Sequence, residues 1–310
     1  MQKRFFLFII CVCIVLTMGS ACSQKNPDHE IRIVTTIFPP YDFARQITSG
    51  LADVTMLLSP GEEVHTYEPS PKDLITVQNC DLFICVGGES EAWVDRLLSS
   101  PETASLRVIR LMDCVQTVTE ETVEGMTVHE HDEAEEPELD EHVWTSPKNA
   151  LTILSRILDA ICEIDPSHAE TYRTNAAAYS AQIETLDREF SALFADGGEI
   201  IVADRFPFRY LADAYNITYY AAYPGCSNDA EPSSATVKYL IDRVREDRVP
   251  VVFTIEFSNG KLADILCEET GCRRLELHSC HNLTKSDFDA GVTYADLMRR
   301  NLENLREAVA

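Results

Sequence analysis

Two histidines lie in polar loops where the neighbouring residues restrict the backbone. His65 stands in SPGEEVHTYEPSPKD, where a Pro-Gly turn precedes it and Ser70 is placed to cap a helix over 71–78. His142 stands in DEHVWTSP, between two acids and an apolar anchor that leads into a helix start. An imidazole held in a loop can bind a metal or act as a general base, although each histidine taken alone could be an ordinary loop residue.

A third histidine-bearing segment, TEETVEGMTVHEHDEAEEPELDE over 119–141, is poor in apolar residues and dense in acid. It cannot bury enough apolar surface to offset its ordering entropy, so we expect a mobile surface loop. His129 and His131 lie among its carboxylates and could hold a cation loosely. A solvated acidic insert with no ligand is the alternative.

Strand and helix patterns alternate around His65. Apolar and β-branched runs predict strands over 31–37, 54–58, 82–86 and 108–111, and helices are predicted over 41–48, 71–78 and 91–98. This alternation is typical of a parallel sheet covered on both faces, whose functional loops follow the carboxyl ends of the strands. His65 follows the strand 54–58 and is therefore expected at such an end.

Two long helical patterns then follow, over 148–162 and 167–194, separated by Asp165-Pro166. At about 1.5 Å per residue the second helix would be roughly 40 Å long, so we expect it to run along two lobes as a stiff spine. Strands are predicted again over 200–203, 217–221, 251–255 and 274–277, with helices over 209–215, 234–246, 261–269 and 294–308. The predicted fold class is α/β, with two Rossmann-like parallel-sheet lobes joined by one long helix.

The amino terminus, MQKRFFLFIICVCIVLTMGSAC, resembles a bacterial lipoprotein signal, in which Cys22 would be lipidated. It departs from that pattern at Gly19, where a leucine is usual, and a plain secretory signal cut near Ala21 is the alternative. Either signal exports the protein. The expected division of the chain is a signal peptide over 1–22, a first lobe over 31–147, linking helices over 148–196 and a second lobe over 197–310.

Composition limits the partners. A formal net charge of −25 excludes a nucleic-acid-binding surface, which needs lysine and arginine to displace counterions. The acidic surface suits a protein that meets cations, or it only keeps an exported protein soluble. Removing Cys11, Cys13 and Cys22 from the 11 cysteines leaves eight, an even number that permits disulfides. The sequence has no CxxC pair, which argues against a structural zinc ribbon. Cys85, in an apolar run, is expected in the core.

Along about the whole mature chain the sequence resembles the metal-binding lipoproteins that feed zinc and manganese ABC importers. The resemblance is carried by PGEEVHTYEPSPKD, DEHVWTSP, Asp165-Pro166, the run FRYLA over 208–212, and Leu283-Thr284-Lys285 with Gly291 and Tyr294. It implies one divalent metal in a cleft between the two lobes, with two histidine ligands from the first lobe. His65 and His142 match those two positions.

The second lobe departs from the family pattern. The family's third ligand falls on Arg205, which cannot bind a metal, and its fourth falls on His278 in LHSCHNLT. We therefore expect His278, together with His281, to supply the second-lobe ligands. Arg205 is expected to pair with Asp204 or Glu256, and Cys226 is expected to lie across the cleft from Cys280 and to form a disulfide with it.

The resemblance implies an extracytoplasmic, monomeric binding protein that captures Zn²⁺ and delivers it to an ABC permease, held at the membrane through lipidated Cys22. Imidazole ligands favour zinc, while Mn²⁺ or iron is the alternative cargo. A zinc hydrolase with Glu62, Glu63 or Glu256 as base is a rival, although the chain has no HExxH pattern. An adhesin-like surface protein with a structural metal is the second rival.

Overall fold

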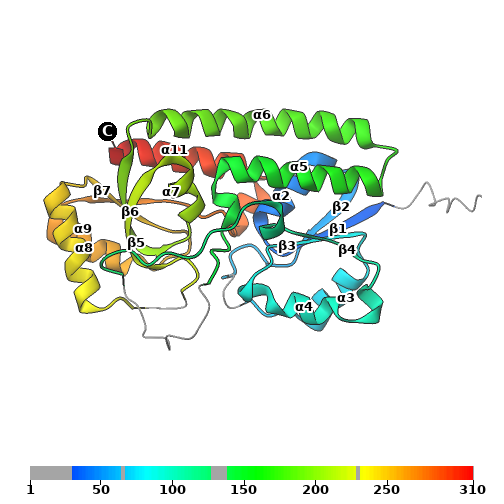
Figure 1. Ribbon diagram of the computed structural model, residues 1–310, viewed down its shortest axis with the longest axis horizontal. Helices are drawn as coiled ribbons and strands as arrows, with labels where there is room; N and C mark the ends of the chain where they lie inside the picture. Colours follow the sequence, from blue (N-terminus) through cyan, green and yellow to red (C-terminus); the bar gives the residue numbers. More distant parts are fainter. Residues whose placement is uncertain (1–29, 64–66, 127–137, 228–230, 310) are drawn as a thin grey trace, which may run out of the picture. The chain divides into compact units, whose positions relative to one another are not determined.

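The computed structural model describes residues 30–63, 67–126, 138–227 and 231–309 (Figure 1). Four residues named above, Cys22, His65, His129 and His131, lie outside these described ranges, as does the predicted signal peptide. No helix in the described ranges is both long enough and apolar enough to cross a membrane.

The first lobe is built on a four-stranded parallel sheet in the order β2-β1-β3-β4. Its strands are β1 (Ile31–Thr35), β2 (Ala52–Met56), β3 (Leu82–Cys85) and β4 (Arg107–Arg110). Helices α2 (Phe38–Thr48), α3 (Pro71–Gln78) and α4 (Ala92–Leu98) connect them. Ser70 caps α3, as predicted, in a reciprocal capping box with Asp73. Cys85 is buried in β3, which confirms its place in the core.

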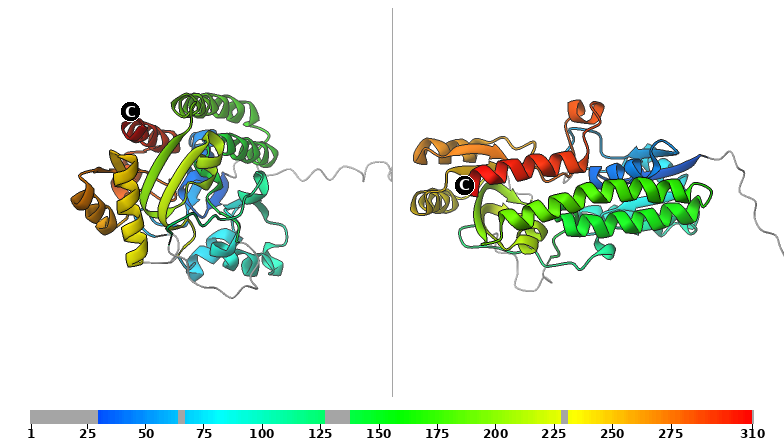
Figure 2. Two further views of the ribbon diagram at one scale, coloured as in Figure 1. Left: turned by 60° about the vertical axis from the view of Figure 1, so that its left-hand side comes forward. Right: turned by 90° about the horizontal axis from the view of Figure 1, so that it is seen from above.

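Two helices connect the lobes, α5 (Pro147–Ile164) and the 25-residue α6 (Ala169–Leu193). The Asp165 carboxylate accepts hydrogen bonds from the His168 ring and the Tyr172 hydroxyl, which fixes the turn between them. Helix α6 packs on α5 and α2 and also on α11 (Tyr294–Val309), so it runs beside both sheets (Figure 1; Figure 2). The predicted spine helix is confirmed within two residues at its start and one at its end.

The second lobe repeats the plan of the first. Its parallel sheet has the order β6-β5-β7-β8, with β5 (Gly198–Phe206), β6 (Ile217–Pro224), β7 (Val251–Thr254) and β8 (Arg273–Glu276). The helices are α7 (Arg209–Tyr215), α8 (Ser234–Asp247), α9 (Lys261–Thr270), the short α10 (Lys285–Asp289) and α11. The predicted fold class, two α/β lobes and a long connecting helix, is confirmed.

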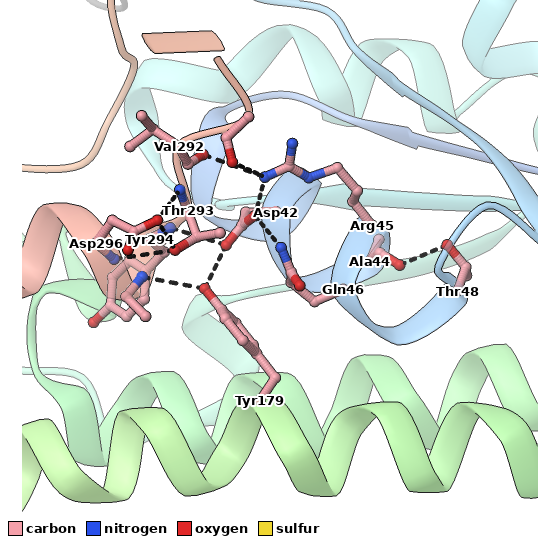
Figure 3. Close-up of polar contacts among 12 residues, drawn as sticks. Asp42, Ala44, Arg45, Gln46, Thr48, Tyr179, Val292, Thr293, Tyr294 and Asp296 are labelled. Atoms are coloured by element: carbon pink, nitrogen blue, oxygen red, sulfur yellow. Dashed lines mark hydrogen bonds and ion pairs between the residues drawn. The ribbon is translucent and has the colours of Figure 1, made fainter. Parts of the chain in front are cut away.

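A buried carboxylate ties α2, α6 and the start of α11 together. Asp42 is fully buried, and it accepts hydrogen bonds from the Tyr179 hydroxyl, the backbone N–H of Tyr294 (2.9 Å) and the side chains of Arg45 and Gln46. Figure 3 shows the Tyr179 side chain pointing from α6 toward Asp42. Because every oxygen of this carboxylate has partners, its burial is compatible with a stable core.

The prediction that all of 119–141 is a mobile loop is wrong for its described ends. Thr119 and Leu139 form an antiparallel bridge, and Met126 is buried. Glu121 accepts a hydrogen bond from the Tyr219 hydroxyl, and Glu120 accepts one from the backbone N–H of Cys226. Polar contacts with the second lobe thus order these ends without a large apolar area.

The eight described cysteines are free thiols, so the expected disulfide between Cys226 and Cys280 is wrong. Cys280 is fully buried, and its thiol points to the carbonyl of His278 two residues earlier. Cys226 instead lies beside Glu120, and burial together with that carboxylate raises its pKa.

Candidate metal centre

A small cavity of about 20 Å³ is lined by residues of both lobes, and we call it the interlobe pocket. It has room for about one water-sized sphere, which is the size of a single ion and too small for a chelate. Its described lining residues are Glu62, Glu63, His142, Arg205, Pro207, Gly225, Ile255, Glu256, Phe257, Ser279, His281 and Asn282.

His142 enters this pocket from the first lobe and is oriented by a carboxylate. Asp140 accepts hydrogen bonds from the backbone N–H of His142 (2.8 Å) and from its ring Nδ1 (3.1 Å). Since a carboxylate only accepts, Nδ1 carries the proton and Nε2 is the nitrogen that can bind a metal. A carboxylate behind the distal nitrogen is the usual support of a histidine ligand.

The electrostatics of His142 are set by opposing effects. The imidazole is 1% exposed, and burial by itself lowers its pKa. The charge and hydrogen bond of Asp140, with the charges of Glu141 and Glu120, outweigh burial and raise the pKa above its ordinary value. The same carboxylates favour a bound cation, so protons and a metal ion compete for this ring.

His281 reaches the same pocket from the second lobe. Its ring centroid lies 5.0 Å from that of His142, with the two rings nearly perpendicular, and 4.7 Å from the ring centroid of Trp144, with those two rings tilted by 60°. The backbone carbonyl of His281 accepts a hydrogen bond from the N–H of Phe38, 3.1 Å away, at the start of α2. Two imidazoles from different lobes therefore line one ion-sized cavity.

His278 is placed differently. It is 6% exposed and is not among the described residues that line the interlobe pocket. Its Nδ1 accepts a hydrogen bond from the backbone N–H of Cys280 (2.9 Å), and Asn301 holds both its backbone N–H and its carbonyl at 2.7 Å. Cys280, between the two histidines, has φ +65°, a conformation rare for a side-chain-bearing residue.

Several residues that position this turn were not anticipated from the sequence. The Trp144 ring donates to the carbonyl of Ser279 (2.8 Å), and Asn282 donates to the carbonyls of Ser59 and Glu62. These bonds join the turn 278–282 to the segment after His142 and to the loop that leads to residue 63. The sequence does show a tryptophan and an asparagine beside the histidine motifs. Their hydrogen-bond partners could not be predicted, because those partners lie more than 100 residues away in the chain.

The expected partners of Arg205 are wrong. Its guanidinium lies 3.0 Å from the carboxylate of Glu63, in the first lobe. Asp204 instead accepts the backbone N–H of Arg205 and the hydroxyl of Ser258. Glu256 accepts the backbone N–H and the hydroxyl of Ser279. Because both second-lobe carboxylates are taken by local donors, the guanidinium pairs across the pocket.

Within 30–63, 67–126, 138–227 and 231–309, no group of three or more His, Cys, Asp or Glu is arranged to hold a metal ion. The described ranges bring together two imidazoles, those of His142 and His281. His65, two residues after Glu63, lies outside these ranges, so the ligand set predicted from the sequence stays a prediction.

Comparison with known proteins places the chain in a family. The family model described as zinc-uptake complex component A, periplasmic (ZnuA), matches residues 33–308. The high-affinity zinc uptake system protein ZnuA of Bacillus subtilis is 32% identical over 318 residues, which cover 99% of this chain and 98% of that protein. The zinc-binding lipoprotein AdcA of Streptococcus pneumoniae is also 32% identical, over 312 residues, but this chain spans 61% of its length.

Solved structures agree. The metal-dependent lipoprotein YcdH of Bacillus subtilis superposes with a TM-score of 0.76 at 29% identity, covering 91% of this chain and 100% of that one. The Zn(II)-bound ZnuA-like domain of Streptococcus pneumoniae AdcA gives a TM-score of 0.73 at 29% identity, covering 91% and 99%. Given a family match over nearly the whole described chain, this protein belongs to the family of periplasmic A components of zinc-uptake complexes.

Proposed function

We propose that the protein captures a single zinc ion outside the cytoplasm and delivers it to an ABC permease. The observation that carries the proposal is the pair of imidazoles, His142 and His281, that reach one ion-sized cavity from two lobes. Relatives named as zinc-binding or zinc-uptake proteins, over nearly all of this chain, support it.

The proposed ligands are His65, His142 and His281. Two imidazoles do not complete the four-coordinate shell that zinc prefers, and His65 follows the described pocket residue Glu63 by two positions. His278 remains an alternative ligand from the sequence. Its hydrogen bonds within the turn favour a different role, that of holding His281 in place.

Zinc is the proposed cargo because neutral imidazole is among its best ligands, while Mn²⁺ sites rely more on carboxylates. Manganese or iron remains the alternative cargo. The pocket does contain carboxylates, but both oxygens of Glu256 accept hydrogen bonds from Ser279. The same hydrogen bonds speak against a general base at Glu256, so we propose a binding protein and not a hydrolase.

The proposed location is the outer face of the cytoplasmic membrane, with a lipid on Cys22 as anchor and the permease as partner. The protein would act as a monomer, since both sides of the metal pocket come from one chain. Fractionation of cells with and without a Cys22→Ala substitution tests the anchor: the parent protein is expected in the membrane fraction and the variant outside it.

The decisive experiment is calorimetric titration of the chelator-stripped protein with zinc and then manganese at neutral pH. We expect tight one-to-one binding of zinc and weaker binding of manganese. His142→Ala and His281→Ala are expected to abolish tight binding, and His278→Ala to weaken it less. Absence of binding of either metal by the parent protein would overturn the proposal, and zinc binding that survives in His281→Ala but not in His278→Ala would exchange their roles.

A further inference from the structure

The ion pair between Arg205 and Glu63 lies in the wall of the metal pocket and joins the lobes. The guanidinium Nη2 and the carboxylate Oε1 are 3.0 Å apart, and both residues line the interlobe pocket. The side chains are 17% and 39% exposed. Among the described lining residues, Arg205 is the one arginine or lysine.

The strand that carries Arg205 is distorted at this point. The pairing of β5 with β6 shifts register between Val202 and Arg205, so the strand is irregular there. Asp204 holds this segment through the backbone N–H of Arg205 (2.8 Å) and the Ser258 hydroxyl. Irregularities of this kind redirect side chains at the ends of strands next to binding sites. The guanidinium is also close to the carbonyl of Ser227, at 3.4 Å, so its position is defined from two sides.

A divalent ion in this pocket would share it with a fixed positive charge. The cavity of about 20 Å³ has room for about one ion, and the guanidinium of Arg205 lies in its wall. Charges in a partly buried site are poorly screened, so the two cations repel each other, and neutral imidazoles do not offset the charge of the metal. A carboxylate that can approach either the metal ion or the guanidinium would therefore control how strongly this repulsion weakens metal binding.

Glu63 is the carboxylate best placed for this. Both oxygens of Glu256 accept hydrogen bonds from Ser279, and they hold the turn that carries His281. Glu62 accepts the backbone N–H of Ser59 within its own loop. Glu63 stands in the pocket wall, and its carboxylate pairs with the guanidinium of Arg205 across the pocket, 3.0 Å away.

We propose that Glu63 is a further ligand of the captured metal ion, and that Arg205 holds this carboxylate while the pocket is empty. When the ion enters, the carboxylate moves from the guanidinium to the metal. Arg205 then acts as an internal competitor that weakens metal affinity and eases release to the permease. This inference rests on the proposed function, and it concerns the fourth ligand and the control of affinity at the same site.

The chain contains a matched control pair. Arg209 and Glu121 also lie 3.0 Å apart, with side chains 23% and 45% exposed, and they join helix α7 to the segment after Thr119. Neither is among the described residues that line the interlobe pocket. Removing this pair therefore tests the effect of losing a similar ion pair that does not line the metal pocket.

The test measures zinc dissociation constants of the full exported protein, purified in detergent, by competition with a chromogenic chelator at fixed pH and salt. Arg205→Gln is expected to bind zinc on the order of tenfold more tightly, and Glu63→Gln on the order of tenfold more weakly. The fold-change in zinc dissociation constant caused by Arg205→Gln is expected to differ between the Glu63→Gln variant and the parent protein. Arg209→Gln and Glu121→Gln are expected within about twofold of the parent.

Cobalt(II) absorption supplies a readout that a merely structural role would not change. Cobalt can report the ligands of a zinc site through its visible spectrum, so replacement of Glu63 by glutamine should alter band positions and intensity. Arg205→Gln should leave the spectrum close to that of the parent. Arg205→Met, which keeps an apolar stem of similar length, serves if Arg205→Gln is poorly folded by circular dichroism.

The outcomes separate the two proposals. If the parent protein binds no zinc, the proposed function fails. If the parent binds zinc but Glu63→Gln keeps its affinity and cobalt spectrum, or if Arg205→Gln and Arg205→Met bind no tighter than the parent, this inference alone is overturned.

Discussion

The two lobes share one fold plan, but they hold their pocket histidines in different ways. In the first lobe a side chain orients the imidazole, because Asp140 accepts the Nδ1–H of His142. In the second lobe backbone contacts hold the segment that carries it, because Asn301 bonds to the backbone of His278 and the N–H of Phe38 donates to the carbonyl of His281. The parallel sheets bring the loops together, and these local contacts fix the segments that carry the two histidines.

Because of this difference, substitutions near the histidines should affect folding stability and metal affinity differently in the two lobes. In the first lobe a substitution behind the histidine should change metal binding more than folding. In the second lobe the histidine is positioned by the same buried hydrogen bonds that hold the turn, so folding and binding should change together.

The largest expected effect is that of Asn301→Ala. The substitution leaves the backbone N–H and carbonyl of His278 without their 2.7 Å partners in a buried place. At about 1 to 3 kcal/mol for each unsatisfied group, the free energy of unfolding should fall by roughly 2 to 6 kcal/mol. Urea denaturation of the metal-free protein measures this, and zinc affinity should fall as well.

Asn304→Ala is the control, because Asn304 lies on the same helix, is only partly buried and donates one exposed hydrogen bond to the carbonyl of Glu276. Its expected cost is under about 1 kcal/mol. Equal destabilisation by the two variants would show that Asn301 does not hold the backbone of His278 as argued. The proposed difference between the two lobes would then lack support from the second lobe.

The next effect in size is that of Asp140→Asn on zinc binding. An amide at this position can present an N–H to Nδ1 and favour the wrong tautomer, and it removes a charge that supports the bound cation. Loss of such a supporting carboxylate costs about 10- to 100-fold in metal affinity. Thermal unfolding of the metal-free protein should change little by comparison, so the ratio of the two effects is the quantity to measure.

The pH dependence of zinc binding sharpens the same comparison. Metal binds the deprotonated imidazole, and Asp140, with Glu141 and Glu120, raises the pKa of His142 despite its burial. Zinc affinity should therefore begin to fall at a higher pH than an ordinary histidine, with a pKa of about 6.5, would give, and it should keep falling as the pH is lowered. In Asp140→Asn the fall should start at lower pH; an unchanged profile would mean that another group controls it.

Much of this architecture follows from sequence pattern. Strand–helix alternation and the uninterrupted helical spacing over 167–194 are local signals, and the structure confirms them. His142 was predicted from its own motif, and the structure places it in the pocket. The start of α2 was predicted three residues late, because Pro39 and Pro40 can form a first helical turn as well as lead into one.

The second-lobe half of the site could not be read in the same way. His278 and His281 are three residues apart, and Cys280 between them has a left-handed conformation that its residue type rarely adopts. The partner of Arg205 is 142 positions away in sequence. Pairings at that distance depend on how the lobes meet, which no local pattern encodes.

The smallest expected effect on zinc affinity is that of Tyr210→Phe, which removes two hydrogen bonds between the lobes and keeps the ring. The Tyr210 hydroxyl, on α7, donates to the carbonyl of Asp140 at 2.7 Å and accepts from the backbone N–H of Val118 at 3.3 Å, and burial raises its pKa to about 12, so it stays a donor at neutral pH. Their loss should lower the free energy of unfolding by about 1 to 2 kcal/mol. Because this contact holds the backbone of Asp140 and not its carboxylate, zinc affinity should fall by much less than in Asp140→Asn. Equal losses in the two variants would mean that the backbone position of residue 140, and not its charge, orients His142, and the first lobe would then resemble the second.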